Sequence, residues 1–262
     1  MSGRWTGKGI ANATNARVVR TFKALSLGVL DRVFPPVCLA CDAAISDHQH
    51  LCAPCWAQLS PITAPICPVM GLPFAMDLGR DAKSAEALAQ PPAFDRARYA
   101  VRFNDKAREI VHHLKYRDRH DMARFCARMM AHAAPEFWAG DGVIVPVPLH
   151  WRRHLSRRYN QSGLLARALA RETGLPVDFE LVRRIRSTQQ QVGLSARARA
   201  QNVRGAFAVN EMALERCLGR RIILVDDVMT TGATITALAK LLRSHYITQV
   251  DVICFARVTS QP

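Results

Sequence analysis

The sequence predicts an α/β protein in which helices cover both faces of a parallel sheet, with a small cysteine-rich module in front of it. Short apolar runs without polar alternation, such as "VIVPVPL" at 143–149, are separated by segments of helical periodicity. This arrangement is typical of strands that are buried on both faces. Two C-x2-C pairs precede the first of these runs. At 262 residues with 49% hydrophobic side chains, the chain is long enough to bury a substantial core.

The N-terminal segment, residues 1–34, is basic and is predicted to form an amphipathic helix from Val18 to Phe34, where apolar positions recur at helical spacing. It has no small-residue cleavage site after its apolar run, so a signal peptide is not expected. Packing against the next module is favoured over association with a membrane. No run in the chain approaches the roughly 18 apolar residues that span a bilayer, so we expect a soluble, cytoplasmic protein without membrane insertion.

The next segment, residues 35–78, is predicted to be a zinc ribbon. Its C-x2-C pairs can each aim two thiolates at one ion, and together they supply the four-sulfur shell of structural zinc sites: Cys38, Cys41, Cys52 and Cys55. Four cysteine ligands leave no open position, so the Zn²⁺ is expected to be structural. Disulfides are disfavoured because other cysteines stand singly in helix-like or strand-like sequence, as in a reducing cytosol.

A second ribbon is predicted to be degenerate. Cys67 opens a similar turn, but Met70 stands where its partner is needed, and a neutral thioether is a poor zinc ligand. Cys67 is therefore expected to be a buried or idle thiol. Residues 79–93 end in a double proline and are predicted to link this part to the main domain, residues 94–262.

The main domain shows alternating strand and helix signals. Strands are expected at 96–103, 141–149, 220–227 and 250–258, and helices in two segments of 105–138 and at 162–173 and 234–245. In parallel sheets, ligands bind beyond the carboxyl ends of the strands.

Two carboxylates, Asp226 and Asp227, end one of the apolar runs and are followed by "TTGAT", which comprises Thr230, Thr231, Gly232, Ala233 and Thr234. Backbone N–H groups at the start of the next helix suit a phosphate, and the threonine hydroxyls add donors. Carboxylates beside a phosphate would repel it unless they accept hydrogen bonds, and vicinal ribose hydroxyls are suitable donors. Together these residues predict a ribose 5-phosphate site.

This strand, acidic pair and loop resemble the binding motif for phosphoribosyl diphosphate (PRPP) of type I phosphoribosyltransferases. The order of the four-cysteine ribbon, "HHLKYRDR", "VIVPVPLHWRRHLSRRYNQS" and "RSTQQQVGLSARARAQNVRGAF" resembles the ComF-like family over about residues 30 to 258. The resemblance implies a type I phosphoribosyltransferase fold, Mg²⁺ bound with PRPP, transfer of phosphoribosyl to an unknown acceptor with release of pyrophosphate, and a link to DNA uptake in natural transformation.

Residues 150–205 carry twelve arginines against three acids. By resemblance, the loop after the strand at 141–149 corresponds to the pyrophosphate loop, which implies that Arg152 takes part in catalysis with Asp226 and Asp227, and that Arg153 and Arg158 contact the diphosphate. Lys115 either reaches the diphosphate or belongs to a surface helix end, and Asn160 either caps the next helix or contacts the ligand. The polar segment 188–207 is the candidate acceptor-binding hood or lid.

Two function classes stay open. The net charge of +15 predicts an acidic partner, and the charge alone does not choose among nucleic acid, a phosphorylated metabolite and anionic lipid; an arginine-rich composition can also reflect genomic base composition. The alternative to a transferase is a catalytically silent PRPP sensor or a binder of single-stranded DNA or RNA. Aromatic residues make up only 7% of the chain and form no stacking platform in the basic stretch. The acceptor and the formation of a homodimer are not determined by the sequence.

Overall fold

The computed structural model describes residues 35–46, 50–79, 81–116, 120–149, 160–186 and 205–259. The chain divides into two compact units, residues 1–52 and 53–262, and each is described by itself. The amphipathic helix predicted for 18–34 lies outside the described residues.

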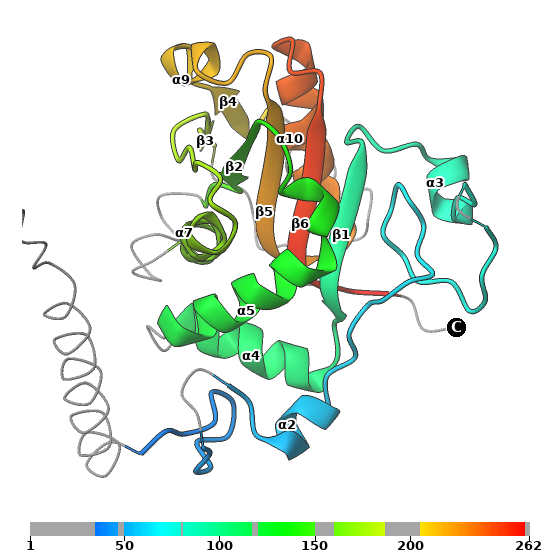
Figure 1. The fold of residues 1–262 in the computed structure, drawn as a ribbon. Coiled ribbons are helices and arrows are strands. Elements are labelled where there is room, and N and C mark those ends of the chain that lie inside the picture. The colour runs from blue at the N-terminus through cyan, green and yellow to red at the C-terminus, as the bar shows by residue number, and fades with distance from the viewer. Residues whose placement is uncertain are drawn as a thin grey trace, which may run out of the picture. The chain divides into compact units, whose positions relative to one another are not determined.

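A four-stranded parallel sheet forms the centre of the second unit, with the strand order β1–β6–β5–β2 (Figure 1). The strands of this sheet are β1 (Arg96–Arg102), β2 (Gly142–Pro146), β5 (Arg221–Met229) and β6 (Val250–Arg257). Their apolar side chains are almost fully buried, and β2, β5 and β6 accordingly contain continuous hydrophobic runs, whereas arginines interrupt the apolar residues of β1. The predicted α/β class is confirmed.

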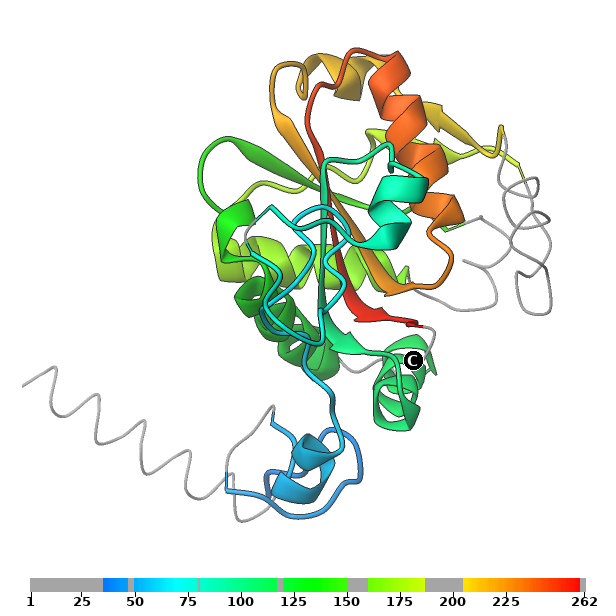
Figure 2. The ribbon, with the colours of Figure 1, turned by 90° about the vertical axis from the view of Figure 1, so that its right-hand side faces the viewer.

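Helices lie on both faces of this sheet. Figure 2 shows α10 on the opposite side of the sheet from α5 and α7. The helices are α2 (Ala53–Ala57), α3 (Ala85–Ala89), α4 (Asp105–Tyr116), α5 (His120–Ala133), α7 (Gln161–Thr173), α9 (Glu211–Glu215) and α10 (Ala233–Ser244), with a 3-10 turn, η1 (Pro135–Phe137).

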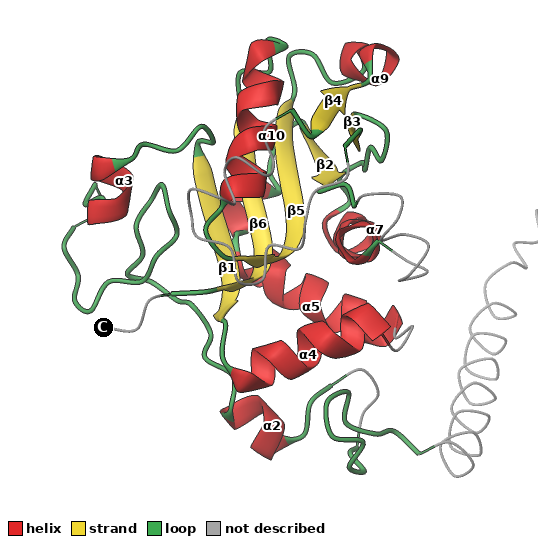
Figure 3. Cartoon of the chain, turned by 180° about the vertical axis from the view of Figure 1, so that it is seen from behind, coloured by secondary structure: helices red, strands yellow, loops and turns green. Residues whose placement is uncertain are grey.

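A small antiparallel pair, β3 (Val182–Arg184) and β4 (Phe207–Val209), lies beside the main sheet near α9 (Figure 3). This pair was not predicted from the sequence. Each strand has only three residues and lies next to arginine-rich, polar sequence, so neither shows a clear two-residue period.

The free edge of β1 is covered by the segment that follows α2. The N–H of Ile62 donates to the carbonyl of Ala100 at 3.0 Å, and the N–H of Ala97 donates to the carbonyl of Val69 at 2.8 Å. Gly71 follows with a φ of 62°, and a Cβ there would lie 2.2 Å from the Ala97 carbonyl oxygen, so only glycine fits. Residues 60–71 thus protect an edge that would otherwise offer unpaired backbone groups.

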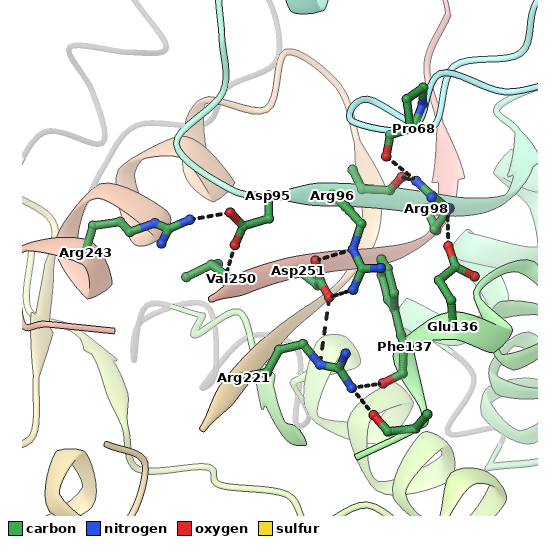
Figure 4. A network of polar contacts seen from close by, with 12 residues as sticks. Pro68, Asp95, Arg96, Arg98, Glu136, Phe137, Arg221, Arg243, Val250 and Asp251 are labelled. Carbon is green, nitrogen blue, oxygen red and sulfur yellow. Dashed lines mark hydrogen bonds and ion pairs between the residues drawn. The ribbon is translucent and has the colours of Figure 1, made fainter. Parts of the chain in front are cut away.

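A network of ion pairs ties together the amino ends of three strands (Figure 4). Asp251 is 1% exposed and accepts two hydrogen bonds from Arg96, at 3.1 and 2.6 Å. Arg221 lies 3.9 Å from the same carboxylate and donates to the carbonyls of Phe137, at 2.8 Å, and Ala139. The network holds the turn before β2 against the end of the sheet that is opposite to the acidic pair.

In the first unit, residues 36–45 form a tight knuckle. The N–H of Cys38 donates to the carbonyl of Ala43 at 2.7 Å, and the N–H of Ile45 donates to the carbonyl of Pro36 at 3.0 Å. Asp42 adopts a φ of 58° in this turn, a conformation that aspartate tolerates better than most residues.

Candidate functional site

The two adjacent acids, Asp226 and Asp227, lie within β5 and not after it. The strand predicted from the sequence ends at Asp227, but β5 continues to Met229 because Val228 and Met229 still pair with β6. Both acids lie in the carboxyl-terminal half of the strand and are only partly buried. They are therefore at the edge of the sheet where parallel folds place ligands.

Hydrogen bonds fix the two carboxylates. Oδ1 of Asp226 accepts from the hydroxyl of Ser162 at 2.8 Å and from the N–H of Asp227 at 2.9 Å. Oδ1 of Asp227 accepts from the N–H of Val228 at 2.7 Å, and its Oδ2 lies 2.7 Å from Nζ of Lys115. Lys115 comes from the end of α4 and Ser162 from the first turn of α7, so three elements meet at the acidic pair.

Burial raises the pKa of Asp226 to about 7, and the negative charge of Asp227 adds to this increase. The hydroxyl of Ser162, the N–H of Asp227 and the charge of Lys115 oppose it without cancelling it. Holding two carboxylates side by side, one of them with a raised pKa, destabilises the folded protein. Destabilising arrangements of this kind are typical of functional sites.

The loop after the acids has the features expected of a phosphate site. Thr230 and Thr231 are exposed, and α10 begins directly after Gly232, so the first N–H groups of this helix have no carbonyl acceptor within the helix. Gly232 has a φ of 73°, and a Cβ there would lie 2.6 Å from Cε of Met229. Any larger residue would strain the turn, so glycine is required for the chain to enter α10 in this way.

The predicted diphosphate residues are placed only in part. Arg152, Arg153 and Arg158 lie outside the described residues, as does most of the predicted hood. Asn160 occupies the N-cap position of α7, but its side chain makes no capping bond; its amide donates to the carbonyl of Val147 at 3.4 Å. The structure therefore contradicts the capping interpretation of this side chain and directs it toward the end of β2.

The four ribbon cysteines converge. Their sulfur atoms all lie within 4.8 Å of one another, and those of Cys41 and Cys52 are 3.6 Å apart. Four sulfurs at about 2.3 Å from one zinc ion would be about 3.8 Å apart, so the cluster fits tetrahedral Zn²⁺. Burial raises the pKa of the Cys38 thiol, but N–H groups of Cys41, Cys52 and Ala40 outweigh it and lower the pKa to about 6. A thiol that ionises readily is a good zinc ligand, and the cluster supports a structural zinc site.

Ser162 was missed by sequence reasoning, since a serine in the first turn of a helix usually has only a local role. Its partner Asp226 is 64 residues away in the chain, and the hydrogen bond joins α7 to β5. The signal that could have found it is its place shortly after the arginines of the predicted pyrophosphate loop, at the same end of the sheet as the acids.

Comparison with known proteins finds both parts of this architecture. The double zinc ribbon domain matches residues 29–88, and the phosphoribosyl transferase domain matches residues 160–262. Within the described residues, no helix has the length and apolar character needed to cross a membrane.

Relatives with known names match most of the chain. The DNA utilization protein YhgH of Salmonella typhimurium is 32% identical over 232 residues, which cover 85% of this chain and 97% of that protein. Competence protein F of Haemophilus influenzae is 31% identical over 175 residues, covering 65% of this chain and 76% of that protein. Competence protein ComFC of Bacillus subtilis is 27% identical over 221 residues, which cover 79% of this chain and 88% of that protein.

Proposed function

Because the chain belongs to the ComF-like family, which joins a zinc ribbon to a phosphoribosyltransferase domain, we propose that it binds PRPP and transfers its phosphoribosyl group to an acceptor. The observation that carries this proposal is the junction of β5 and α10. Two carboxylates lie near the end of β5, and the loop after β5 leads into the free N–H groups at the start of α10, which can bind an anion. The carboxylates accept the ribose hydroxyls, and the loop from Thr230 to Thr234 binds the 5-phosphate.

The reaction is a displacement at C1 of the ribose. The bond from C1 to the diphosphate oxygen breaks, and its electron pair leaves with pyrophosphate. The acceptor atom forms the new bond to C1 and loses its proton to solvent. This chemistry needs positioning and charge stabilisation more than a nucleophilic side chain. Lys115 adds positive charge at the ribose and contributes to holding the substrate, while Arg152, Arg153 and Arg158 are proposed to bind the diphosphate.

When bound with PRPP, Mg²⁺ would supply charge neutralisation for the leaving diphosphate. The residues of the site fit such an ion, because the carboxylates of Asp226 and Asp227 are oxygen donors of the kind that Mg²⁺ prefers.

The test is a calorimetric titration of PRPP with Mg²⁺ into the zinc-loaded full chain. The variant Asp226→Asn/Asp227→Asn should lose about a hundredfold or more in affinity, since it removes two charged acceptors worth about 1.5–3 kcal/mol each. The matched control is Asp105→Asn/Asp141→Asn, which makes the same charge change at carboxylates that are 94% and 72% exposed. Unchanged affinity in the first variant, or no binding by the wild-type chain, would contradict the proposal.

Turnover is tested separately by pyrophosphate release with purine, pyrimidine and amine acceptors. Release that depends on one acceptor class and is lost in Asp226→Asn/Asp227→Asn identifies an enzyme. PRPP binding without release for any acceptor would support a PRPP-sensing protein instead.

A second candidate function is binding of single-stranded nucleic acid, with the PRPP site as a sensor. It is favoured by the names of the relatives, which refer to DNA utilization and competence, and by the net charge of +15. Affinity for a single-stranded oligonucleotide measured against salt concentration tests it. A logarithmic slope of about −0.7 for each neutralised phosphate is expected of a binder, and a flat response would exclude this function.

A further inference from the structure

Arg257, the last residue of β6, is a buried arginine beside the loop that follows β5. The residue is 5% exposed, and its Nη1 donates to the backbone carbonyl of Thr230. Its Nη2 donates to the carboxylate of Glu86 at 3.1 Å, and its guanidinium lies 5.7 Å from the ring centroid of Tyr99. Its Nε is buried and has no hydrogen-bond partner among the described residues. Burying a guanidinium that is not fully hydrogen-bonded is costly, so packing alone does not account for it.

The two carbonyls at the start of the loop both accept hydrogen bonds from residues at the end of β6 or directly after it. The carbonyl of Met229 accepts from the N–H of Val258 at 3.0 Å, and the carbonyl of Thr230 accepts from Arg257. In a planar trans peptide, the N–H of the following residue points opposite to the carbonyl. The N–H groups of Thr230 and Thr231 therefore both point away from β6, and successive N–H groups on one side form a concave anion site.

We propose that Arg257 is a positioning residue for the phosphate loop: by holding the Thr230 carbonyl, it turns the N–H of Thr231 toward the 5-phosphate. This inference rests on the proposed function, since it assigns a 5-phosphate to the loop. Arg257 acts through the backbone and does not touch the ligand.

Glu86, which accepts a hydrogen bond from Arg257, connects this arginine to the segment predicted as a degenerate second ribbon. It lies in α3, whose N-cap Ser84 accepts a hydrogen bond from the N–H of Ala87 at 3.3 Å. The N–H of Ser84 in turn donates to the sulfur of Cys67 at 3.3 Å, and Cys67, Met70 and Ala87 are all buried in one apolar cluster. Apolar packing thus holds α3 where it can present Glu86 to Arg257.

The experiment uses the full chain labelled with ¹⁵N-threonine and ribose 5-phosphate as the probe. In the wild type, binding should shift the amide resonances of both Thr230 and Thr231. In Arg257→Gln, the Thr231 response should be lost and the affinity should fall about tenfold or more. The Thr230 response should persist, because the Met229 carbonyl is held by the backbone of Val258 and not by Arg257.

Two further variants separate positioning from folding. Glu86→Gln changes a side chain that is 47% exposed, so the chain should fold, and it should weaken ribose 5-phosphate binding by a smaller factor than Arg257→Gln. Arg243→Gln is the matched control: it removes an arginine that also binds backbone carbonyls and an aspartate, but at the opposite end of α10. It should lower the unfolding temperature and leave the affinity unchanged.

The proposal is overturned if Arg257→Gln and Glu86→Gln bind ribose 5-phosphate as the wild type does, with both threonine amides responding. It is also overturned if Arg243→Gln loses as much affinity as Arg257→Gln, because the effect is then one of general stability. A wild-type chain that does not bind ribose 5-phosphate refutes the proposed function, and this inference with it.

Discussion

Replacing Asp226 with asparagine should make the protein more stable while it destroys the proposed ribose site. Burial and the neighbouring charge of Asp227 raise the pKa of Asp226 from 3.8 to about 7. A shift of about three units corresponds to roughly 4 kcal/mol, which is the upper limit of what ionising this residue costs the folded state at pH 8. Asparagine keeps an oxygen that can accept from Ser162 and from the N–H of Asp227. We expect Asp226→Asn to raise the free energy of unfolding by about 1–2 kcal/mol at pH 8.

The pH dependence gives the sign of this effect. Between about pH 4 and pH 7 the folded protein holds a proton on Asp226 that the unfolded chain has released, so the wild type loses stability as the pH rises through this window. The advantage of the variant should therefore be large at pH 8 and small at pH 5.

Urea unfolding of wild type and Asp226→Asn at pH 5, 6, 7 and 8 measures this difference. The histidines titrate in both proteins, so their contributions to the free energy of unfolding cancel in the comparison. Asp105→Asn, at a carboxylate that is 94% exposed, is the control and should show no such trend. A variant that is less stable than the wild type at pH 8, or a difference that does not change with pH, would show that ionised Asp226 does not destabilise the folded protein.

Four further predictions concern other parts of the molecule. Lys115→Met removes the ion-pair partner of Asp227 and should lower the free energy of unfolding by about 1–3 kcal/mol at pH 8. The loss should be smaller at pH 5, where Asp226 is protonated and one negative charge fewer is left without Lys115. Urea unfolding at the two pH values measures both. Asp251→Asn breaks a buried pair and should cost about 3 kcal/mol in urea unfolding, with PRPP affinity unchanged. Tyr246 is 85% exposed with a φ of 63°, so Tyr246→Gly should stabilise the protein by about 1 kcal/mol, measured by thermal unfolding; a loss would contradict this. Removing zinc with a chelator should expose residues 35–55 to proteolysis, and resistance to the protease after metal loss would argue against a structural zinc.

The sequence predicted β2, β5 and β6 because strands buried on both faces contain continuous apolar runs, and it also predicted β1, whose apolar residues are interrupted by Arg98. It predicted the end of β5 two residues too early, since a pair of aspartates resembles a strand end when the pairing partner is unknown. The small strands β3 and β4 were missed because three-residue strands show no usable period. The domain bounds at 34, 78 and 93 stay predictions, although the segment predicted as a linker contains the helix α3.

The candidate site was predictable where its residues are adjacent in the chain and unpredictable where they are not. Asp226, Asp227 and the loop that follows form a continuous motif. Ser162 and Arg257 reach this motif from other elements, and neither carries a local signal: one resembles an ordinary helix residue and the other a surface charge at a strand end. Lys115 was identified as a site candidate, but its pairing with Asp227 depends on how α4 packs beside β5.

If the two carboxylates bind a ribose diol beside a phosphate, the site should distinguish two sugar phosphates that differ in one hydroxyl, which calorimetry can measure. Ribose 5-phosphate should bind at least about tenfold more tightly than 2-deoxyribose 5-phosphate, because the deoxy sugar leaves one partly buried carboxylate acceptor without a donor. This preference should disappear in Asp226→Asn/Asp227→Asn. Equal affinity of the wild type for the two sugars would show that the carboxylates do not bind the ribose diol.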